Sequence, residues 1–454
     1  MRFERRSVLP HSAERVFRWH GRPGAFARLV PPWEQVRLCG PHPGLVEGSE
    51  AQFELRIGPV PVTWVARHTE VVADRQFVDT MIRGPFASWR HLHRFEPLAG
   101  TESALVDTID YALPFPPCSR IAAPAVRGQL ARTFRYRHAV TAGDLALHNR
   151  LPTQPLTVAI TGASGFIGRT LSAMLTTGGH SVIPLVRRRP GTSERQWNPA
   201  GPVDPATFQG VDVVVHLAGE SIADGRWSPA RQAEIRRSRA MGTAAIAAGM
   251  KAAAPGPRLL ISASAVGFYG DRGETLLDES ASAGTGFFPD VVAAWEAATD
   301  GLEAARIRVI NTRFGIVLSP GGGALAKMLL PFRLGLGGRL GHGRQWMSWI
   351  SIDDCAGALV HLIHSGIRGP VNLVAPEPVT NATFTSTLGN LLQRPAVAWV
   401  PAPALRLLVG GLADEGLLAS TRVTPTKLVA DGYQFRHPTL AAGLGHVLGL
   451  GEAG

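Results

Sequence analysis

The chain of 454 residues is poor in cysteine and has no long apolar run. Cys39, Cys118 and Cys355 lie far apart, which excludes a disulfide-rich scaffold and a cysteine-rich metal site. Gly, Pro, Arg or His interrupts every apolar run before it reaches the ~18–20 residues of a membrane span. The first residues also lack the apolar stretch of a secretory signal. We therefore expect a cytoplasmic protein without a membrane span.

Lysine is scarce too, since only Lys251, Lys327 and Lys427 are lysines among 46 basic residues. The net charge of +11 comes from arginines spread along the chain. No basic block alternates with aromatic residues as a binder of single-stranded nucleic acid requires, so we expect no nucleic-acid partner. The composition, 45% hydrophobic and 18% charged, is globular, and the length predicts two or three domains.

Residues 1–150 are predicted to form an α+β domain. Short alternating runs bounded by Gly, Pro or Asp predict antiparallel strands at residues 3–9, 50–58, 62–72, 75–82, 89–98 and 103–113. A helix is expected after Ser12, a suitable N-cap, and a long amphipathic helix over residues 121–147. This order favours a sheet that wraps around the terminal helix.

Residues 156–378 are predicted to form a doubly wound parallel sheet of the Rossmann type, after a linker marked by Pro152 and Pro155. Continuous apolar runs predict strands at residues 156–162, 181–186, 211–219, 258–264 and 307–318. Helices are expected over 167–175 and 230–250. Residues 379–454 alternate short helical patterns with prolines and predict a small helical C-terminal domain.

A glycine-rich turn directly follows the first of these strands and precedes a helix. In such a turn Gly162 allows the tight bend, Gly165 lets the backbone approach a pyrophosphate, and Gly168 lets the helix pack closely. The helix N-terminus offers free N–H groups to the phosphates. We therefore predict a dinucleotide site, with cofactor-binding residues Gly162, Ser164, Gly165, Phe166, Ile167 and Gly168.

The end of the second strand of the sheet usually selects the cofactor. This sequence has Arg187 and Arg188 there, and no acid between Gly168 and Glu194. An arginine fork suits a 2′-phosphate, whereas an acid would suit a free ribose. We predict NADP(H) over NAD(H), with Arg187 as first candidate and Arg188 as second. The alternative is that both are solvated surface arginines.

With HLAGESI (His216 to Ile222) and SASAVGFYG (Ser262 to Gly270), this turn resembles the short-chain dehydrogenase/reductase superfamily, and more closely its atypical, nucleotide-sugar-epimerase-like branch. The resemblance implies that Leu217, Ala218 and Gly219 lie at the cofactor. WMSWISIDD (Trp346 to Asp354) and the tail through residue 440 resemble the C-terminal domain of that branch, which has no assigned function. Residues 1–150 resemble the helix-grip superfamily of polyketide-cyclase-like (SRPBCC) and START-like domains.

The resemblance implies a Ser/Tyr/Lys proton relay that this sequence lacks. Ser264 matches the serine, with Ser262 as the fallback. Counting back from Glu296 by the family's spacing puts Phe288 at the tyrosine and Val292 at the lysine, and neither side chain moves a proton. No Tyr-x-x-x-Lys occurs anywhere in the chain.

Two residues are candidates to replace the missing acid or base. Glu220 follows the HLAG strand end, where we expect it to point toward the nicotinamide, and Tyr269 lies in the loop after Ser264. The alternatives are a helix-capping or salt-bridged acid for Glu220 and a packing role for Tyr269. Arg313, at a strand end, faces the substrate crevice or forms a structural salt bridge.

No metal site is predicted. Asp353 and Asp354 precede an apolar helix and are more simply its N-cap and first turn. His91 and His93 share one face of a strand without an apparent third ligand.

Three hypotheses follow for the function. The first is an oxidoreductase or epimerase-like enzyme that transfers a hydride between NADP(H) and an unknown small substrate. The second is a non-catalytic NADP(H)-binding protein, such as a redox sensor. The third is a carrier of a hydrophobic ligand in residues 1–150, whose aromatic residues form either a cavity lining or a plain core: Phe53, Trp64, Phe77, Trp89 and Phe95.

Overall fold

The computed structural model describes residues 1–40, 44–115, 119–220, 222 and 227–451. The chain divides into two compact units, Met1–Thr153 with Ala173–Gly179, and Gln154–Ser172 with His180–Gly454. Cys39 and Cys355 are free thiols, and Cys118 lies outside the described residues. None of the helices described is long and apolar enough to cross a membrane. The domain limits 1–150, 156–378 and 379–454 remain predictions.

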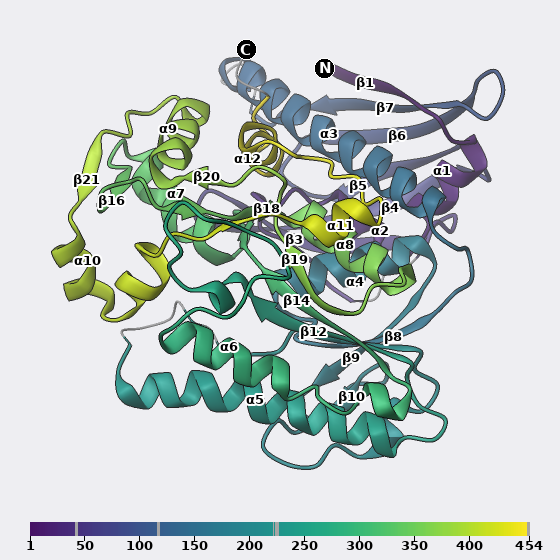
Figure 1. Cartoon of the computed structure of the whole chain (residues 1–454). Coiled ribbons are helices and arrows are strands. Elements are labelled where there is room, and N and C mark those ends of the chain that lie inside the picture. Colours follow the sequence, from purple (N-terminus) through teal and green to yellow (C-terminus); the bar gives the residue numbers. More distant parts are fainter. Residues whose placement is uncertain (41–43, 116–118, 221, 223–226, 452–454) are drawn as a thin grey trace. The chain divides into compact units, whose positions relative to one another are not determined.

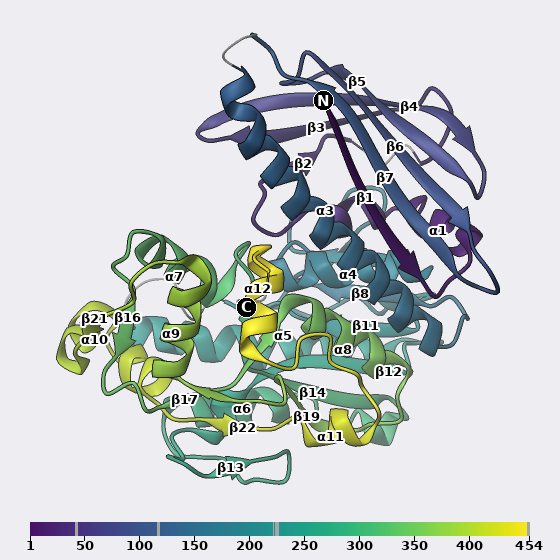
Figure 2. The same ribbon diagram turned by 90° about the horizontal axis from the view of Figure 1, so that it is seen from above.

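The first unit is built on a seven-stranded antiparallel sheet in the order β1-β7-β6-β5-β4-β3-β2. Its elements are β1 (Arg2–Leu9), α1 (Ala13–His20), α2 (Ala25–Leu29), β2 (Val36–Leu38), β3 (Glu50–Ile57), β4 (Val60–Val72), β5 (Gln76–Arg83), β6 (Ser88–Pro97), β7 (Ser103–Ala112) and α3 (Ser119–Arg150). Figure 2 shows α3 lying along one face of the sheet. The predicted α+β fold is confirmed, and only the short α2 and β2 were not foreseen.

Helix α3 belongs to this sheet because its apolar side chains complete the core. Leu145 shares a buried cluster with Phe95, and Phe134 shares another with Ile109. Each such side chain contributes about 1.5–3 kcal/mol when it leaves water. Helix α1 packs in the same cluster as Leu145, and Ser12 caps it, as predicted, because the Ser12 hydroxyl accepts from the backbone N–H of Arg15.

The five aromatic candidates of this unit divide into two groups. Phe77 and Phe95 belong to the packed core. Phe53 stacks on Trp64 with ring centres 5.7 Å apart, and Trp64 meets Trp89 edge to face at 5.2 Å. A hydrophobic ligand in this unit remains a prediction.

The second unit contains a seven-stranded parallel sheet in the order β10-β9-β8-β11-β12-β14-β19. The sheet and its surroundings comprise β8 (Thr157–Thr161), α4 (Phe166–Gly178), β9 (Ser181–Val186), β10 (Arg195–Gln196), β11 (Val213–His216), α5 (Pro229–Ala252), β12 (Leu259–Ala265), α6 (Phe287–Ala297), β14 (Arg308–Phe314), α8 (Ile352–His364) and β19 (Gly369–Leu373). The division into units assigns α4 from Ala173 onward to the first unit. Helices α5 and α6 cover one face of the sheet (Figure 1). The doubly wound fold is confirmed, and its strand order reverses between β8 and β11.

The strand predicted over residues 307–318 is wrong as a single element. It breaks at Gly315 into β14 and β15 (Ile316–Leu318), and β15 pairs with β18 (Trp349–Ser351) instead of continuing the central sheet. A Cβ at Gly315 would lie 2.6 Å from the carbonyl oxygen of Ser348, so only glycine permits this close crossing.

The segment from residue 379 is mostly helical, as expected. Its helices are α9 (Asn381–Leu392), α10 (Ala402–Val409), α11 (Thr426–Ala430) and α12 (Leu440–Leu448). Short strands tie this segment to earlier parts of the second unit: β20 (Val379–Thr380) to β17 (Trp346–Met347), β21 (Ala398–Val400) to β16 (Gly338–Leu340), and β22 (Arg422–Val423) to β13 (Leu276–Leu277).

Candidate dinucleotide-binding site

The glycine loop joins the buried strand β8 to helix α4. Gly162 has φ of +70°, a left-handed conformation that favours glycine, and a Cβ there would come within 3.0 Å of the backbone of Leu217. A Cβ on Gly168 would lie 2.3 Å from the carbonyl oxygen of Gly162. Ser164 and Gly165 are exposed in the loop. The glycines thus allow α4 to begin close to the loop, with the unpaired N–H groups of its first turn available to a ligand.

The remaining residues predicted at the cofactor border this loop. Phe166 and Ile167 begin α4 and are half-buried. A Cβ at Gly322 would come within 2.8 Å of the Phe166 ring, so that segment packs directly on the ring. Across the loop, Leu217 and Ala218 are half-buried after β11, and Gly219 is exposed.

A polar contact joins the ends of β8 and β11, and sequence reasoning missed it. The backbone N–H groups of Leu217 and Ala218 each donate to Thr161 Oγ1 at 3.1 Å. With both lone pairs occupied, the Thr161 hydroxyl donates to His216 Nδ1 at 2.7 Å. Burial lowers the pKa of His216 to about 4, so the ring is neutral. The contact lies where the strand order reverses, which is where an open α/β sheet binds its ligand.

Arg187 and Arg188 directly follow β9 and differ in their surroundings. Arg188 is paired with Glu194, at 2.8 and 2.6 Å from its two carboxylate oxygens. The Arg187 side chain is 68% exposed, and its Nη1 lies 3.9 Å from Glu220 Oε1. The Arg188 side chain is almost as exposed, at 65%, so the two differ in pairing and not in exposure, and Arg187 is the less tightly held. A cofactor role for either arginine remains a prediction.

Glu220 lies among arginines. Its Oε2 is 3.4 Å from Arg231 Nη1, and its carbonyl oxygen accepts from Arg239 at 2.9 Å. Burial lowers the pKa of Arg239 to about 10, against the opposing effect of the Glu220 charge. With Arg187 also nearby, Glu220 has the geometry of the salt-bridged acid. It lies close to the residue that follows β9. Its role as a catalytic acid remains a prediction.

Ser264, near the end of β12, contacts a buried ion pair. Its hydroxyl donates to Glu296 Oε1 at 2.6 Å. Glu296, on α6, binds Arg313 of β14 through two hydrogen bonds of 2.8 Å, and the Arg313 side chain is only 4% exposed. Burial alone would lower the pKa of Arg313, but the paired carboxylate raises it, so the guanidinium stays charged. Arg313 thus forms a structural salt bridge. The hydroxyl proton of Ser264 is donated to Glu296 and is not directed to a substrate.

Tyr269 belongs to the same network and is fully buried. Its hydroxyl accepts from Arg313 Nη1 at 3.0 Å and donates to Asn372 Oδ1 at 2.8 Å. Burial raises the pKa of Tyr269. This geometry matches the packing role weighed for Tyr269, and its catalytic role remains a prediction.

Helix α6, which would carry the tyrosine and lysine of the relay, has apolar side chains at these two positions. Phe288 and Val292 are buried on α6, and Phe288 packs against Trp227. The N-terminus of α6 is capped by a residue far away in the sequence. The backbone N–H groups of Phe287 and Phe288 donate to the Glu415 carboxylate at 2.9 and 2.8 Å.

Asp353 and Asp354 were predicted to form the N-cap and first turn of α8. Both lie in the first turn, as expected, but the N-cap is Ser351, whose hydroxyl accepts from the backbone N–H of Asp354 at 3.0 Å. The Asp354 carboxylate instead accepts from the backbone N–H groups of Arg436 and His437 at 2.7 and 3.0 Å. Asp354 therefore orders the C-terminal segment, a use that no local pattern indicates.

A buried parallel sheet with a glycine turn at its switch point defines a dinucleotide-binding protein of the doubly wound class. Residues 158–374 match the NAD dependent epimerase/dehydratase family, residues 400–447 a domain of unknown function (DUF1731), and residues 9–137 the polyketide cyclase / dehydrase and lipid transport family. An epimerase family protein of Mycobacterium tuberculosis is 45% identical over 292 residues, which cover 64% of this chain and 96% of the relative. The chain belongs to this epimerase family, and the resemblance found in the sequence is confirmed.

Solved structures agree with this assignment. The crystal structure of a nucleoside-diphosphate sugar epimerase from Corynebacterium glutamicum is 33% identical with a TM-score of 0.82, and the match covers 99% of this chain and 91% of that one. The human epimerase family protein SDR39U1, solved with NADPH, is 34% identical with a TM-score of 0.60, and the match covers 64% of this chain and 99% of that one.

Proposed function

We propose that this chain binds NADP(H) at the glycine loop and transfers a hydride to or from a carbon of a small substrate. The observation that carries the proposal is the loop itself, where Gly162 is left-handed and Gly168 has no room for a Cβ. The exposed Arg187 and the NADPH in the human relative support NADP(H) over NAD(H). When bound, NADP⁺ accepts a hydride from a substrate carbon and NADPH returns one.

A titration tests the cofactor. We expect the purified protein to bind NADPH more tightly than NADH, and Arg187→Ala to weaken NADPH binding by about tenfold or more, because a charge-assisted hydrogen bond to the 2′-phosphate is lost. NADH binding is expected to stay unchanged. Arg189→Ala, at an exposed neighbouring arginine, is the matched control. Equal affinity of the wild type for NADPH and NADH would refute the preference.

The second candidate is a non-catalytic NADP(H)-binding protein, and the buried Phe288 and Val292 favour it. For hydride transfer, a group of this chain must accept the substrate's hydroxyl proton. The candidates are Glu220, Ser264 and Tyr269. Glu220 is the most exposed of the three and is therefore the first to test.

A transfer assay separates the two candidates. The protein is loaded with NADP⁺ and mixed with nucleoside-diphosphate sugars, the substrate class in the name of the Corynebacterium relative. We expect the fluorescence of reduced nicotinamide to appear, and Glu220→Gln to slow its appearance by about 10²–10⁴-fold, the usual contribution of a general acid or base. Glu303→Gln, at an exposed glutamate, is the control. Tight NADPH binding without transfer across a broad panel of sugars and small carbonyl compounds would instead support the non-catalytic candidate.

A further inference from the structure

Three polar side chains gather on one face of the antiparallel sheet in the first unit. Asp79 on β5 is paired in register with His91 on β6. His93, two residues further along β6, points to the same face as His91. Both histidine side chains are buried, and the Asp79 side chain is 24% exposed. Sequence reasoning found the two histidines but missed Asp79, because only the pairing of β5 with β6 brings it to them.

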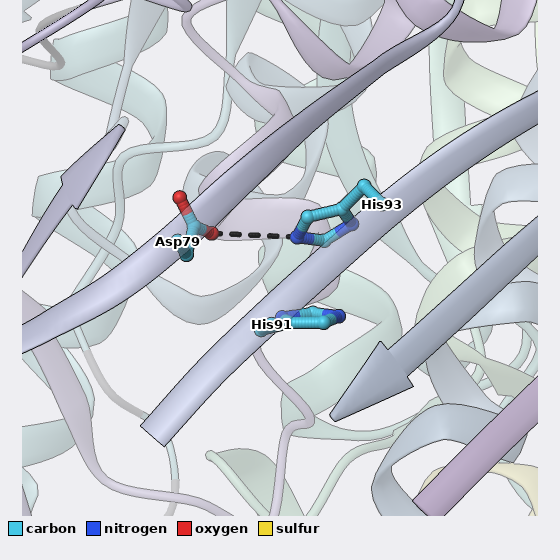
Figure 3. A group of neighbouring side chains, drawn as sticks. All are labelled: Asp79, His91 and His93. Carbon is cyan, nitrogen blue, oxygen red and sulfur yellow. Dashed lines mark hydrogen bonds and ion pairs between the residues drawn. The ribbon is translucent and has the colours of Figure 1, made fainter. Parts of the chain in front are cut away.

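The three side chains meet closely. One ligand atom from each lies within 4.8 Å of the other two. Figure 3 shows Asp79 facing His93, with the His91 ring beside that of His93. The Nε2 of His93 lies 3.3 Å from Asp79 Oδ2, and the centres of the two imidazole rings are 3.8 Å apart.

We propose that Asp79, His91 and His93 bind a divalent transition-metal ion. Two imidazoles and one carboxylate are a donor set that zinc, cobalt and ferrous iron accept. With metal–ligand bonds near 2.1 Å, tetrahedral ligand atoms lie about 3.4 Å apart, so small side-chain rotations bring the three together. Three protein ligands leave a further coordination position for water or for an oxygen or nitrogen donor of a ligand.

A second set of polar groups has the arrangement that metal sites use to orient their ligands. Histidine ligands usually donate their other ring N–H to a carboxylate. Here Asp107 Oδ1 lies 2.9 Å from His91 Nε2 and 2.7 Å from His93 Nδ1. His68 Nδ1 in turn contacts Asp79 Oδ1 at 2.5 Å. One carboxylate thus serves both histidines and leaves each a second ring nitrogen.

The surroundings can hold a cation. Asp79 and Asp107 place two carboxylates in a part of the core where Phe77 stacks on the His93 ring with centres 4.1 Å apart. Carboxylates in apolar surroundings need a compensating positive charge, which either protonated histidines of the cluster or a bound metal ion supplies. The Asp79 side chain is 24% exposed, so the cluster meets solvent at this residue.

The alternative is a purely structural network in which protons alone join the histidines and the carboxylates. His138, on α3, has such a contact, because its Nε2 lies 2.7 Å from Asp107 Oδ2. A network of this kind needs no metal, whereas the proposed site retains one ion per chain through dialysis. The two alternatives therefore differ in a quantity that can be measured directly.

The experiment uses the full-length protein, stripped with a chelator, incubated with Zn²⁺ and dialysed. We expect about one zinc per chain by elemental analysis, consistent with one set of three ligands. Asp79→Asn and His91→Gln are expected to weaken zinc binding at least about tenfold, since each removes or neutralises a ligand. His342→Gln, at an exposed histidine of the other unit, controls for surface binding and is expected to keep the metal.

A second readout does not require the variants to fold. Co²⁺ added to the stripped wild type is expected to show the visible spectrum of a four- or five-coordinate ion, with paramagnetically shifted imidazole resonances in NMR. Loss of all zinc from the wild type on dialysis, or equal retention by folded Asp79→Asn and His91→Gln, would overturn the proposal, as would a Co²⁺ spectrum no different from that of the aqueous ion. None of these readouts depends on NADP(H) binding.

Discussion

Glu296→Ala is expected to lower the free energy of unfolding of the second unit by about 3–5 kcal/mol, because it leaves the Arg313 guanidinium buried without its carboxylate. The same change removes the acceptor of the Ser264 hydroxyl. We would measure it by urea unfolding of the full chain, with hydrogen exchange of peptides from β12 and β14 to assign the loss to this unit.

The control for this variant is Glu303→Ala. The ion pair between Glu303 and Arg368 has a contact of 3.3 Å, and its side chains are 57% and 60% exposed. A solvated pair of this kind contributes about 0–1 kcal/mol. A second variant, Glu296→Leu with Arg313→Met, is expected to recover much of the loss, since apolar groups can replace a buried pair. If Glu296→Ala and Glu303→Ala lowered the free energy of unfolding equally, the buried pair would stabilise the protein no more than the exposed one.

Gly168→Ala is expected to weaken NADPH binding by about ten- to a hundredfold. The new Cβ would lie 2.3 Å from the carbonyl oxygen of Gly162 and 2.7 Å from the Cα of Ala163, and both are backbone atoms that cannot rotate away. Overpacking of this kind costs about 1–3 kcal/mol, which corresponds to that range of dissociation constants if binding must restore the loop.

The matched control is Gly366→Ala, at a glycine of the same unit where a Cβ would meet nothing within 4 Å. It is expected to leave NADPH affinity unchanged. Fluorescence titration of both variants measures the difference, and circular dichroism checks that both are folded. If Gly168→Ala bound NADPH as tightly as the wild type, the close packing of helix α4 on the loop would not be required for NADPH binding.

The glycine loop could be predicted from the sequence because its geometry depends on neighbouring residues. The eight residues from Thr161 to Gly168 contain the strand end, the left-handed turn and the start of the helix, and each of these has its own residue signature. Alternation with a period of 2 likewise predicted the antiparallel sheet, and the helical period predicted α3. Continuous apolar runs predicted the parallel sheet except for its outer strands β10 and β19. The strand predicted over residues 307–318 was wrong as a single element, because tertiary packing at Gly315 divides this continuous apolar run.

The surroundings of Ser264 could not be predicted in the same way. Its acceptor Glu296 is 32 residues away, and Tyr269 donates to Asn372, 103 residues further along the chain. Such pairs share no spacing that a single sequence reveals, because three different strands and a helix bring them together. The sequence showed that the Tyr and Lys positions hold Phe288 and Val292, but not that Ser264 is hydrogen-bonded to a buried ion pair.

Features that depend on neighbouring residues could be predicted from the sequence: the two fold classes, the glycine loop, the N-cap at Ser12 and the absence of a Tyr-x-x-x-Lys. Which distant groups meet depends on the tertiary structure. Asp79 meets the two histidines because antiparallel pairing of β5 and β6 places it opposite His91. The reason is physical: backbone periodicity follows from local sterics, whereas contacts between side chains depend on how whole elements pack.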